Sequence, residues 1–209
     1  MVPILYEDKD IIVVHKPAGL ESQSSRGFAP DMVSEISCYL HNPQDIHKPA
    51  AGISRVQPPY VGVIHRLDKP VQGVMVYAKN QKSAAALSAA LQAGKMEKSY
   101  MAVICGQLVD KQGSYVDYLR QDRKNNTSEI VDKSVKDAKK AVLKYREMEV
   151  IHSPEDKEQM VSLIDIELLT GRHHQIRAQF AGHATPLYGD ERYGGGLSTK
   201  STNMTVDRG

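Results

Sequence analysis

The stretch His65-Arg66-Leu67-Asp68-Lys69-Pro70 separates two apolar runs, Val61-Gly62-Val63-Ile64 and Gly73-Val74-Met75-Val76-Tyr77-Ala78. Short runs rich in β-branched residues are typical of buried strands, so we expect a strand, a polar loop and a second strand. Loops held by a rigid scaffold often carry catalytic groups. Asp68 is suited to act as a nucleophile or general base, with Arg66 or another cation keeping it ionised. Taken alone, the tetrapeptide 65–68 is better explained by an ordinary aspartate in a turn than by a catalytic one.

Strand patterns continue on both sides of this stretch. Residues 4–19 predict a β-hairpin, because two β-branched segments flank an acidic turn and Lys-Pro-Ala-Gly ends the second one. The other candidates are strands at 98–106, 140–150 and 160–169, and helices at 31–40, 83–91 and 170–180. Strands outnumber helices, and short polar turns join many of them. The pattern predicts an α+β fold with a mixed, largely antiparallel sheet and flanking helices.

The composition narrows the class of protein. The chain has 209 residues, of which 41% are hydrophobic, so it can bury a core as one domain or a two-lobed unit. It contains no apolar run of the roughly 20 residues that cross a bilayer and no secretory signal pattern at the N-terminus, and we expect a cytoplasmic protein. Cys38 and Cys105 lack CxxC spacing, which argues against a disulfide framework and a cysteine-rich zinc site. No glycine-rich phosphate loop is present.

Charge is distributed in blocks along the second half of the chain. Basic residues dominate from 120 to 146 and acidic residues from 147 to 167, so the net charge of +2 averages two opposite segments. One interpretation is a solvated surface on which the charged residues happen to be unevenly distributed. The other is a basic face that binds a phosphate backbone.

A second polar cluster reads Gly171-Arg172-His173-His174-Gln175-Ile176-Arg177. Adjacent helical positions diverge by about 100°, so the two histidines are poorly placed to share a metal ion. Arg177 is suited to bind a carboxylate or phosphate, although a surface arginine is the simpler interpretation in isolation. Tyr100, at the start of an apolar strand, fits either core packing or an aromatic face against a nucleobase.

Taken together in this order, the segments resemble the RluA-type RNA pseudouridine synthases. The matching stretches are 4–19, 64–80, 98–106 and 170–194, the last of which contains Gly-Arg-x-His-Gln-Ile-Arg and Gly-Asp-x-x-Tyr-Gly. The resemblance implies isomerisation of uridine to pseudouridine in tRNA or rRNA, with structured RNA as the partner and with no cofactor, metal, membrane or obligate protein partner. It also implies a catalytic domain over 1–194 with a central RNA-binding cleft and no S4 module, followed by a polar, mobile tail over 195–209.

The resemblance assigns roles to individual residues. Asp68 matches the catalytic aspartate, Arg177 the arginine that pairs with it, and Tyr100 the tyrosine that stacks near the target base and is a candidate for proton removal. Because the base must leave the helical stack, Arg66 is expected to fill the vacated place. The full set of expected RNA contacts is Arg66, His65, Lys16, Arg172 and His174.

Several positions depart from the family pattern. Residues 70–72 replace the usual Asp/Thr/Ser-type residues, His173 replaces a usual threonine, and Gln179 stands where a histidine is common. Relatives usually continue past Gly194 with a Leu-His-Ala segment and another strand, whereas a polar stretch follows here.

Two other functions therefore remain open at this point. One is a catalytically inactive RNA-binding relative of the family. The other is a metal-dependent phosphoesterase that uses His65, Asp68 and His174, which the ligand spacing supports only weakly.

Overall fold

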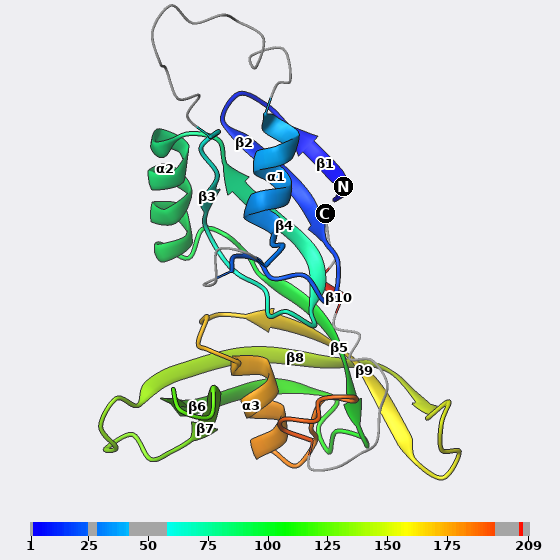
Figure 1. Cartoon of the computed structure of the whole chain (residues 1–209). Coiled ribbons are helices and arrows are strands. Elements are labelled where there is room, and N and C mark those ends of the chain that lie inside the picture. The colour runs from blue at the N-terminus through cyan, green and yellow to red at the C-terminus, as the bar shows by residue number, and fades with distance from the viewer. Residues whose placement is uncertain (1, 25–28, 42–57, 195–204, 207–209) are drawn as a thin grey trace, which may run out of the picture. The chain divides into compact units, whose positions relative to one another are not determined.

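The computed structural model describes residues 2–24, 29–41, 58–194 and 205–206. The chain forms two compact units, Met1–Lys95 and Met96–Gly209, which we call the N-terminal and C-terminal units (Figure 1). The predicted domain over 1–194 is thus built from two compact parts. The predicted tail lies outside the described residues except for Thr205–Val206, which form the strand β10 and pair with β5. None of the helices in the described residues is long and apolar enough to cross a bilayer.

The N-terminal unit contains an antiparallel sheet in the order β1-β2-β4, with β3 also paired to β4. Its strands are β1 (Ile4–Glu7), β2 (Ile11–Lys16), β3 (Gly62–Val63) and β4 (Gln72–Ala78). The predicted hairpin is confirmed, and its turn is closed by the Asp8 carboxylate, which accepts from the amides of Asp10 and Ile11. Strand, loop and strand around Asp68 are also confirmed.

The unit also contains two helices, one between β2 and β3 and one after β4. Helix α1 (Met32–Leu40) begins as predicted at Asp31, whose side chain accepts from the Ser34 amide in a capping box. Its buried residues Met32 and Ile36 belong to the core of the unit. Helix α2 (Gln81–Gln92) is capped by Asn80 and contacts β3 and β4.

The C-terminal unit has a longer antiparallel sheet in the order β10-β5-β9-β8-β6-β7. Its strands are β5 (Ser99–Cys105), β6 (Gln112–Asp122), β7 (Thr127–Ile130), β8 (Lys139–His152), β9 (Met160–Leu168) and β10 (Thr205–Val206). Ala102, Ile104, Leu143, Ile164 and Ile166 are almost fully buried in its core. The predicted α+β class with a largely antiparallel sheet is confirmed.

The sequence predictions missed the β6–β7 hairpin altogether. Its turn carries Asn126 with a φ of 51°, in the left-handed region that asparagine tolerates better than most residues. Segments 112–122 and 127–130 are largely exposed, and their hydrophobic alternation is correspondingly weak.

The third helix, α3 (Gln175–Gly182), starts later than predicted. His174 has a φ of 49°, so residues 170–174 form a loop and not the first turn of the helix. The Gln175 side-chain oxygen accepts from the Thr170 hydroxyl and the Arg172 amide, which closes this loop. Figure 1 shows α3 over the strands of its unit, and it contacts β6 and β7.

Candidate active site

Residues 65–71, which lie between β3 and β4, form what we call the Asp68 loop. Leu67 is buried at its centre, and both of its main-chain groups bond to one hydroxyl: Ser22 Oγ donates to the Leu67 carbonyl at 2.7 Å and accepts from the Leu67 amide at 3.0 Å. The Val71 amide donates to the Asp68 carbonyl at 3.0 Å and closes a turn. The main chain on both sides of Asp68 is therefore fixed.

Lys16 supports the same loop from β2. Its side chain is fully buried, and Nζ donates to the carbonyls of Pro17, Leu20 and Lys69 at 3.0, 2.6 and 3.2 Å. Three carbonyl acceptors match the three donors of an ammonium. Burial lowers the pKa of Lys16 to about 8, while the charge of Asp68 acts in the opposite direction.

The expected RNA contact of Lys16 is not compatible with this geometry. A buried ammonium whose donors go to main-chain carbonyls cannot reach a phosphate, so we assign Lys16 to the support of the Asp68 loop. The alternation in β2 carried the signal for this placement, since Ile12, Val14 and Lys16 lie on one buried face.

The other predicted residues of the loop differ in exposure. Arg66 is exposed, and Asp68 and His65 are half-buried. His65 Nε2 accepts from the Val76 amide at 3.3 Å, so one ring nitrogen faces the neighbouring strand. Arg66 is thus the more accessible of the two residues expected to contact RNA from this loop.

In the C-terminal unit, Tyr100 and α3 lie on the same face of the sheet. Tyr100 in β5 is opposite Ile166 in β9, and Ile166 is opposite Tyr145 in β8. Directly opposed residues of antiparallel strands point to the same face. Tyr145 packs edge-on against Phe180 of α3. Tyr100 is half-buried on the face that carries Arg177.

Arg177 on α3 is held by an acidic residue that the sequence predictions did not assign. Nε and Nη2 donate to the two carboxylate oxygens of Asp190 at 2.6 and 2.7 Å. The side chains are 12% and 2% exposed, so this is a nearly buried bidentate ion pair. The Tyr193 ring covers the guanidinium, with 4.9 Å between Cζ and the ring centroid. The motif Gly-Asp-x-x-Tyr-Gly contained both partners.

The two adjacent histidines lie in the loop before α3, and their rings stack at 3.8 Å. The helical spacing assumed from the sequence was therefore wrong for this pair. His174 Nδ1 is 2.9 Å from the Tyr193 hydroxyl. His173 is 3.0 Å from Ser128 Oγ through Nδ1 and 3.1 Å from Asn126 Oδ1 through Nε2, so it joins α3 to the β6–β7 turn.

A profile of the RNA pseudouridylate synthase family matches residues 10–182. The chain belongs to the RluA family of RNA pseudouridine synthases. It is 34% identical over 197 residues to an uncharacterized RNA pseudouridine synthase of Aquifex aeolicus, covering 92% of this chain and 56% of that protein. It is 32% identical over 194 residues to the ribosomal large subunit pseudouridine synthase D of Xanthomonas campestris, covering 93% and 52%. The chain spans about half the length of these relatives.

Solved structures share the fold at lower identity. Human RNA pseudouridylate synthase domain containing 1 superposes with a TM-score of 0.76 at 17% identity, over 99% of this chain and 76% of that one. Human RNA pseudouridylate synthase domain containing 4 gives 0.69 at 20% identity, over 98% and 82%. The likeness confirms the fold expected for an RNA pseudouridine synthase.

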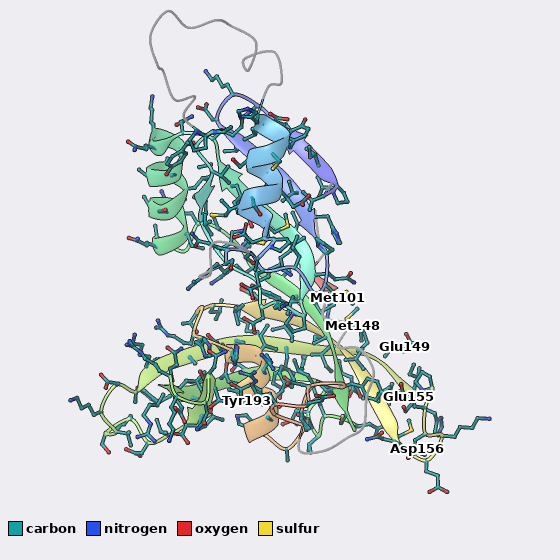
Figure 2. All side chains as sticks on the ribbon, in the orientation of Figure 1. Met101, Met148, Glu149, Glu155, Asp156 and Tyr193 are labelled. Carbon is teal, nitrogen blue, oxygen red and sulfur yellow. The ribbon has the colours of Figure 1, made fainter. Side chains whose placement is uncertain are left out.

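The basic and acidic blocks of the sequence lie at different places in the C-terminal unit. Strand β8 has 14 residues and is roughly 45 Å long, running from the basic to the acidic block. We call the basic part the basic end; its exposed cations include Arg120, Arg123, Lys124, Lys133, Lys136, Lys139, Lys140 and Arg172. Arg172 belongs to it because its Nε donates to the Lys140 carbonyl. Figure 2 shows Glu149, Glu155 and Asp156 on the β8–β9 hairpin, away from Tyr193.

Two of the residues that depart from the family pattern, Gln179 and His173, form hydrogen bonds within the protein. Gln179 is fully buried, donates to Asp117 at 2.7 Å and accepts from Gln175 at 2.9 Å. His173 bonds to the β6–β7 turn as described above. Within the residues that the structure describes, no three His, Cys, Asp or Glu side chains are arranged to hold a metal ion.

Proposed function

We propose that this chain isomerises uridine to pseudouridine in structured RNA, with Asp68 as the catalytic carboxylate. The observation that carries the proposal is the Asp68 loop itself, in a chain that belongs to the pseudouridine synthase family. Ser22 and Lys16 fix the main chain on both sides of Asp68, whereas its side chain stays half-buried. A carboxylate on a fixed loop is pre-oriented toward a substrate, which lowers the entropic cost of the reaction.

The proposed reaction conserves the atoms of the nucleoside. The bond between N1 of uracil and C1′ of ribose breaks, uracil rotates, a bond forms between C5 and C1′, C5 loses its proton and N1 gains one. The Asp68 carboxylate either attacks C1′, forming an ester bond that breaks again when C5 bonds to C1′, or stabilises positive charge on the ribose. Arg177 pairs with Asp68 in this proposal, and Tyr100 removes the C5 proton.

RNA is the proposed partner because the basic end gives the C-terminal unit a surface for phosphates. Exposed arginines and lysines neutralise a phosphate backbone and release counterions, so we expect binding to weaken as salt increases. Exposed Arg66 is proposed to fill the place of the extruded uridine. Large-subunit rRNA is the first RNA to test, since several similar proteins are named for it; tRNA is the second.

Release of tritium from C5 tests this proposal. The protein is incubated with rRNA and tRNA transcripts that contain uridine tritiated at C5, and label in the solvent is counted. We expect release from at least one pool, with intact strands. Binding of both pools without release would instead identify an inactive RNA-binding relative. Strand scission that a chelator abolishes would favour the phosphoesterase.

A further inference from the structure

We propose that Asp190 and Tyr193 are positioning residues for Arg177, so that the segment 190–193 decides where the guanidinium points. The inference rests on the proposed function for its catalytic consequence, because Arg177 acts there with Asp68. Its structural part rests on contacts within the C-terminal unit alone.

Asp190 fixes the plane of the guanidinium. Two parallel hydrogen bonds along the Nε–Nη2 edge define both the direction and the rotation of the group, which a single contact does not. The edge that carries Nη1 lies outside this pair and faces another direction. Both carboxylate oxygens of Asp190 therefore accept from Arg177, and Asp190 acts through Arg177 and not on the reacting atoms.

The segment that carries Asp190 is itself held in place. The Arg192 amide donates to Asp190 Oδ1 at 3.2 Å, and the Asp190 amide donates to the Leu187 carbonyl at 3.1 Å. A Cβ at Gly194 would lie 2.6 Å from the Asp190 carbonyl oxygen, a distance that real Cβ atoms do not adopt. The tight turn after Asp190 thus requires glycine at this position.

Tyr193 connects the guanidinium to two other elements. Its hydroxyl oxygen accepts from the Ser128 amide of β7 at 2.7 Å, and the hydroxyl proton is then available for His174 Nδ1 at 2.9 Å. The same ring covers Arg177. One side chain therefore joins Arg177, the start of α3 and the β6–β7 hairpin of the basic end.

This arrangement is more than packing of the fold around a buried charge. A free arginine side chain samples many rotamers, and a bidentate partner and an aromatic ring over the guanidinium remove this freedom before substrate binds. Loss of the Tyr193 hydroxyl leaves the ring, the ion pair and the hydrophobic core in place. A purely structural role for the segment predicts no change at Arg177 in such a variant.

The test measures Arg177 directly by hydrogen exchange of its Nε–H in ¹⁵N NMR, assigned by its loss in Arg177→Lys. We expect exchange to accelerate at least about tenfold in Asp190→Asn, the factor for a lost bond of about 1.4 kcal/mol. We expect a smaller but measurable acceleration in Tyr193→Phe. The matched control is Tyr188→Phe, which removes a hydroxyl two residues before the segment 190–193 that lies 3.1 Å from Ser153 Oγ; it should leave the Arg177 signal unchanged.

Tritium release in single turnover is measured on the same samples, with thermal unfolding as the check of folding. In Tyr193→Phe we expect a rate several-fold below that of Tyr188→Phe at unchanged RNA affinity. Unchanged Nε–H exchange in folded Asp190→Asn, or equal behaviour of Tyr193→Phe and Tyr188→Phe, would overturn the inference. If Asp190→Asn does not fold, the comparison of Tyr193→Phe with Tyr188→Phe tests the inference by itself. Accelerated exchange in the variants, together with no tritium release by the wild-type protein, would refute the proposed function and leave the positioning role intact.

Discussion

The two units hold their candidate catalytic side chains in opposite ways. In the N-terminal unit, Ser22 and Lys16 bind the main chain next to Asp68. In the C-terminal unit, Asp190 and Tyr193 bind the side chain of Arg177 itself. A support that binds main-chain atoms tolerates changes of side chain in the loop, whereas a support that binds a guanidinium depends on the identity of each partner.

This difference explains why residues 70–72 can depart from the family pattern. The Lys69 carbonyl accepts from Lys16 Nζ and the Gly19 amide, and the Asp68 carbonyl accepts from the Val71 amide. All of these acceptors and the Val71 donor are main-chain groups that any residue except proline supplies. Pro70 itself donates nothing in this set, so the departure leaves the support of Asp68 unchanged.

The largest expected effect comes from breaking the side-chain support. Asp190→Ala leaves the guanidinium of Arg177 with its buried partner removed, and we expect the free energy of unfolding to fall by about 3–5 kcal/mol. Urea denaturation monitored by circular dichroism measures it. A loss below about 1 kcal/mol would contradict the view that this pair is buried and mutually dependent.

Removing the main-chain support should cost less. Ser22→Ala leaves both main-chain groups of buried Leu67 without their partner, and we expect a loss of about 1–3 kcal/mol. The same denaturation experiment on Ser134→Ala, an exposed turn serine, serves as control and should stay within about 0.5 kcal/mol of the wild type. Equal effects of the two variants would show that Ser22 does not hold the loop.

Lys16 adds a dependence on pH to this support. Its folded-state pKa of about 8 lies below the ordinary value of 10.5, so between these values the unfolded chain binds more protons than the folded chain. The free energy of unfolding linked to Lys16 therefore increases with pH in this window, by up to about 1 kcal/mol per pH unit. Urea denaturation of the wild type and Lys16→Met at pH 7.5 and 9.5 measures it. A difference between the two proteins that does not change with pH would contradict the low pKa.

The smallest effect is expected at an exposed ion pair of the C-terminal unit. Lys144 and Glu167 lie 3.1 Å apart, but their side chains are 57% and 49% exposed. Lys144→Ala should change the free energy of unfolding by no more than about 0.5 kcal/mol. A loss comparable to that of Asp190→Ala would mean that burial does not separate the two kinds of pair.

Local pattern predicted the parts of the fold that depend on neighbouring residues. The hairpin of β1 and β2, the cap at Asp31 and the strands around Asp68 follow from alternation and capping residues that lie within a few positions of each other. The predicted start of α3 was wrong because His174 adopts a left-handed conformation, which the hydrophobic spacing of the segment did not indicate. The β6–β7 hairpin was missed because its exposed strands carry a weak alternation.

In the candidate site, too, local sequence pattern predicted some features and not others. Asp68, Tyr100 and Arg177 were predicted from the order of several motifs, but several of the contacts that hold these parts of the chain join residues far apart in sequence. Ser22 and Leu67 are 45 residues apart, and Ser128 and Tyr193 are 65 apart. Such pairs arise only when the sheet brings the segments together, so a linear pattern does not reveal them.

The most direct test of the account compares pseudouridine formation by the wild type and Asp68→Asn. Nucleosides from treated rRNA and tRNA transcripts are separated by chromatography, because uridine and pseudouridine have equal mass. Asp156→Asn is the matched control, an exposed aspartate in the β8–β9 turn. We predict pseudouridine with the wild type and with Asp156→Asn, and none with Asp68→Asn at equal folded protein and equal RNA binding. Pseudouridine formed by Asp68→Asn at the wild-type rate would contradict the account.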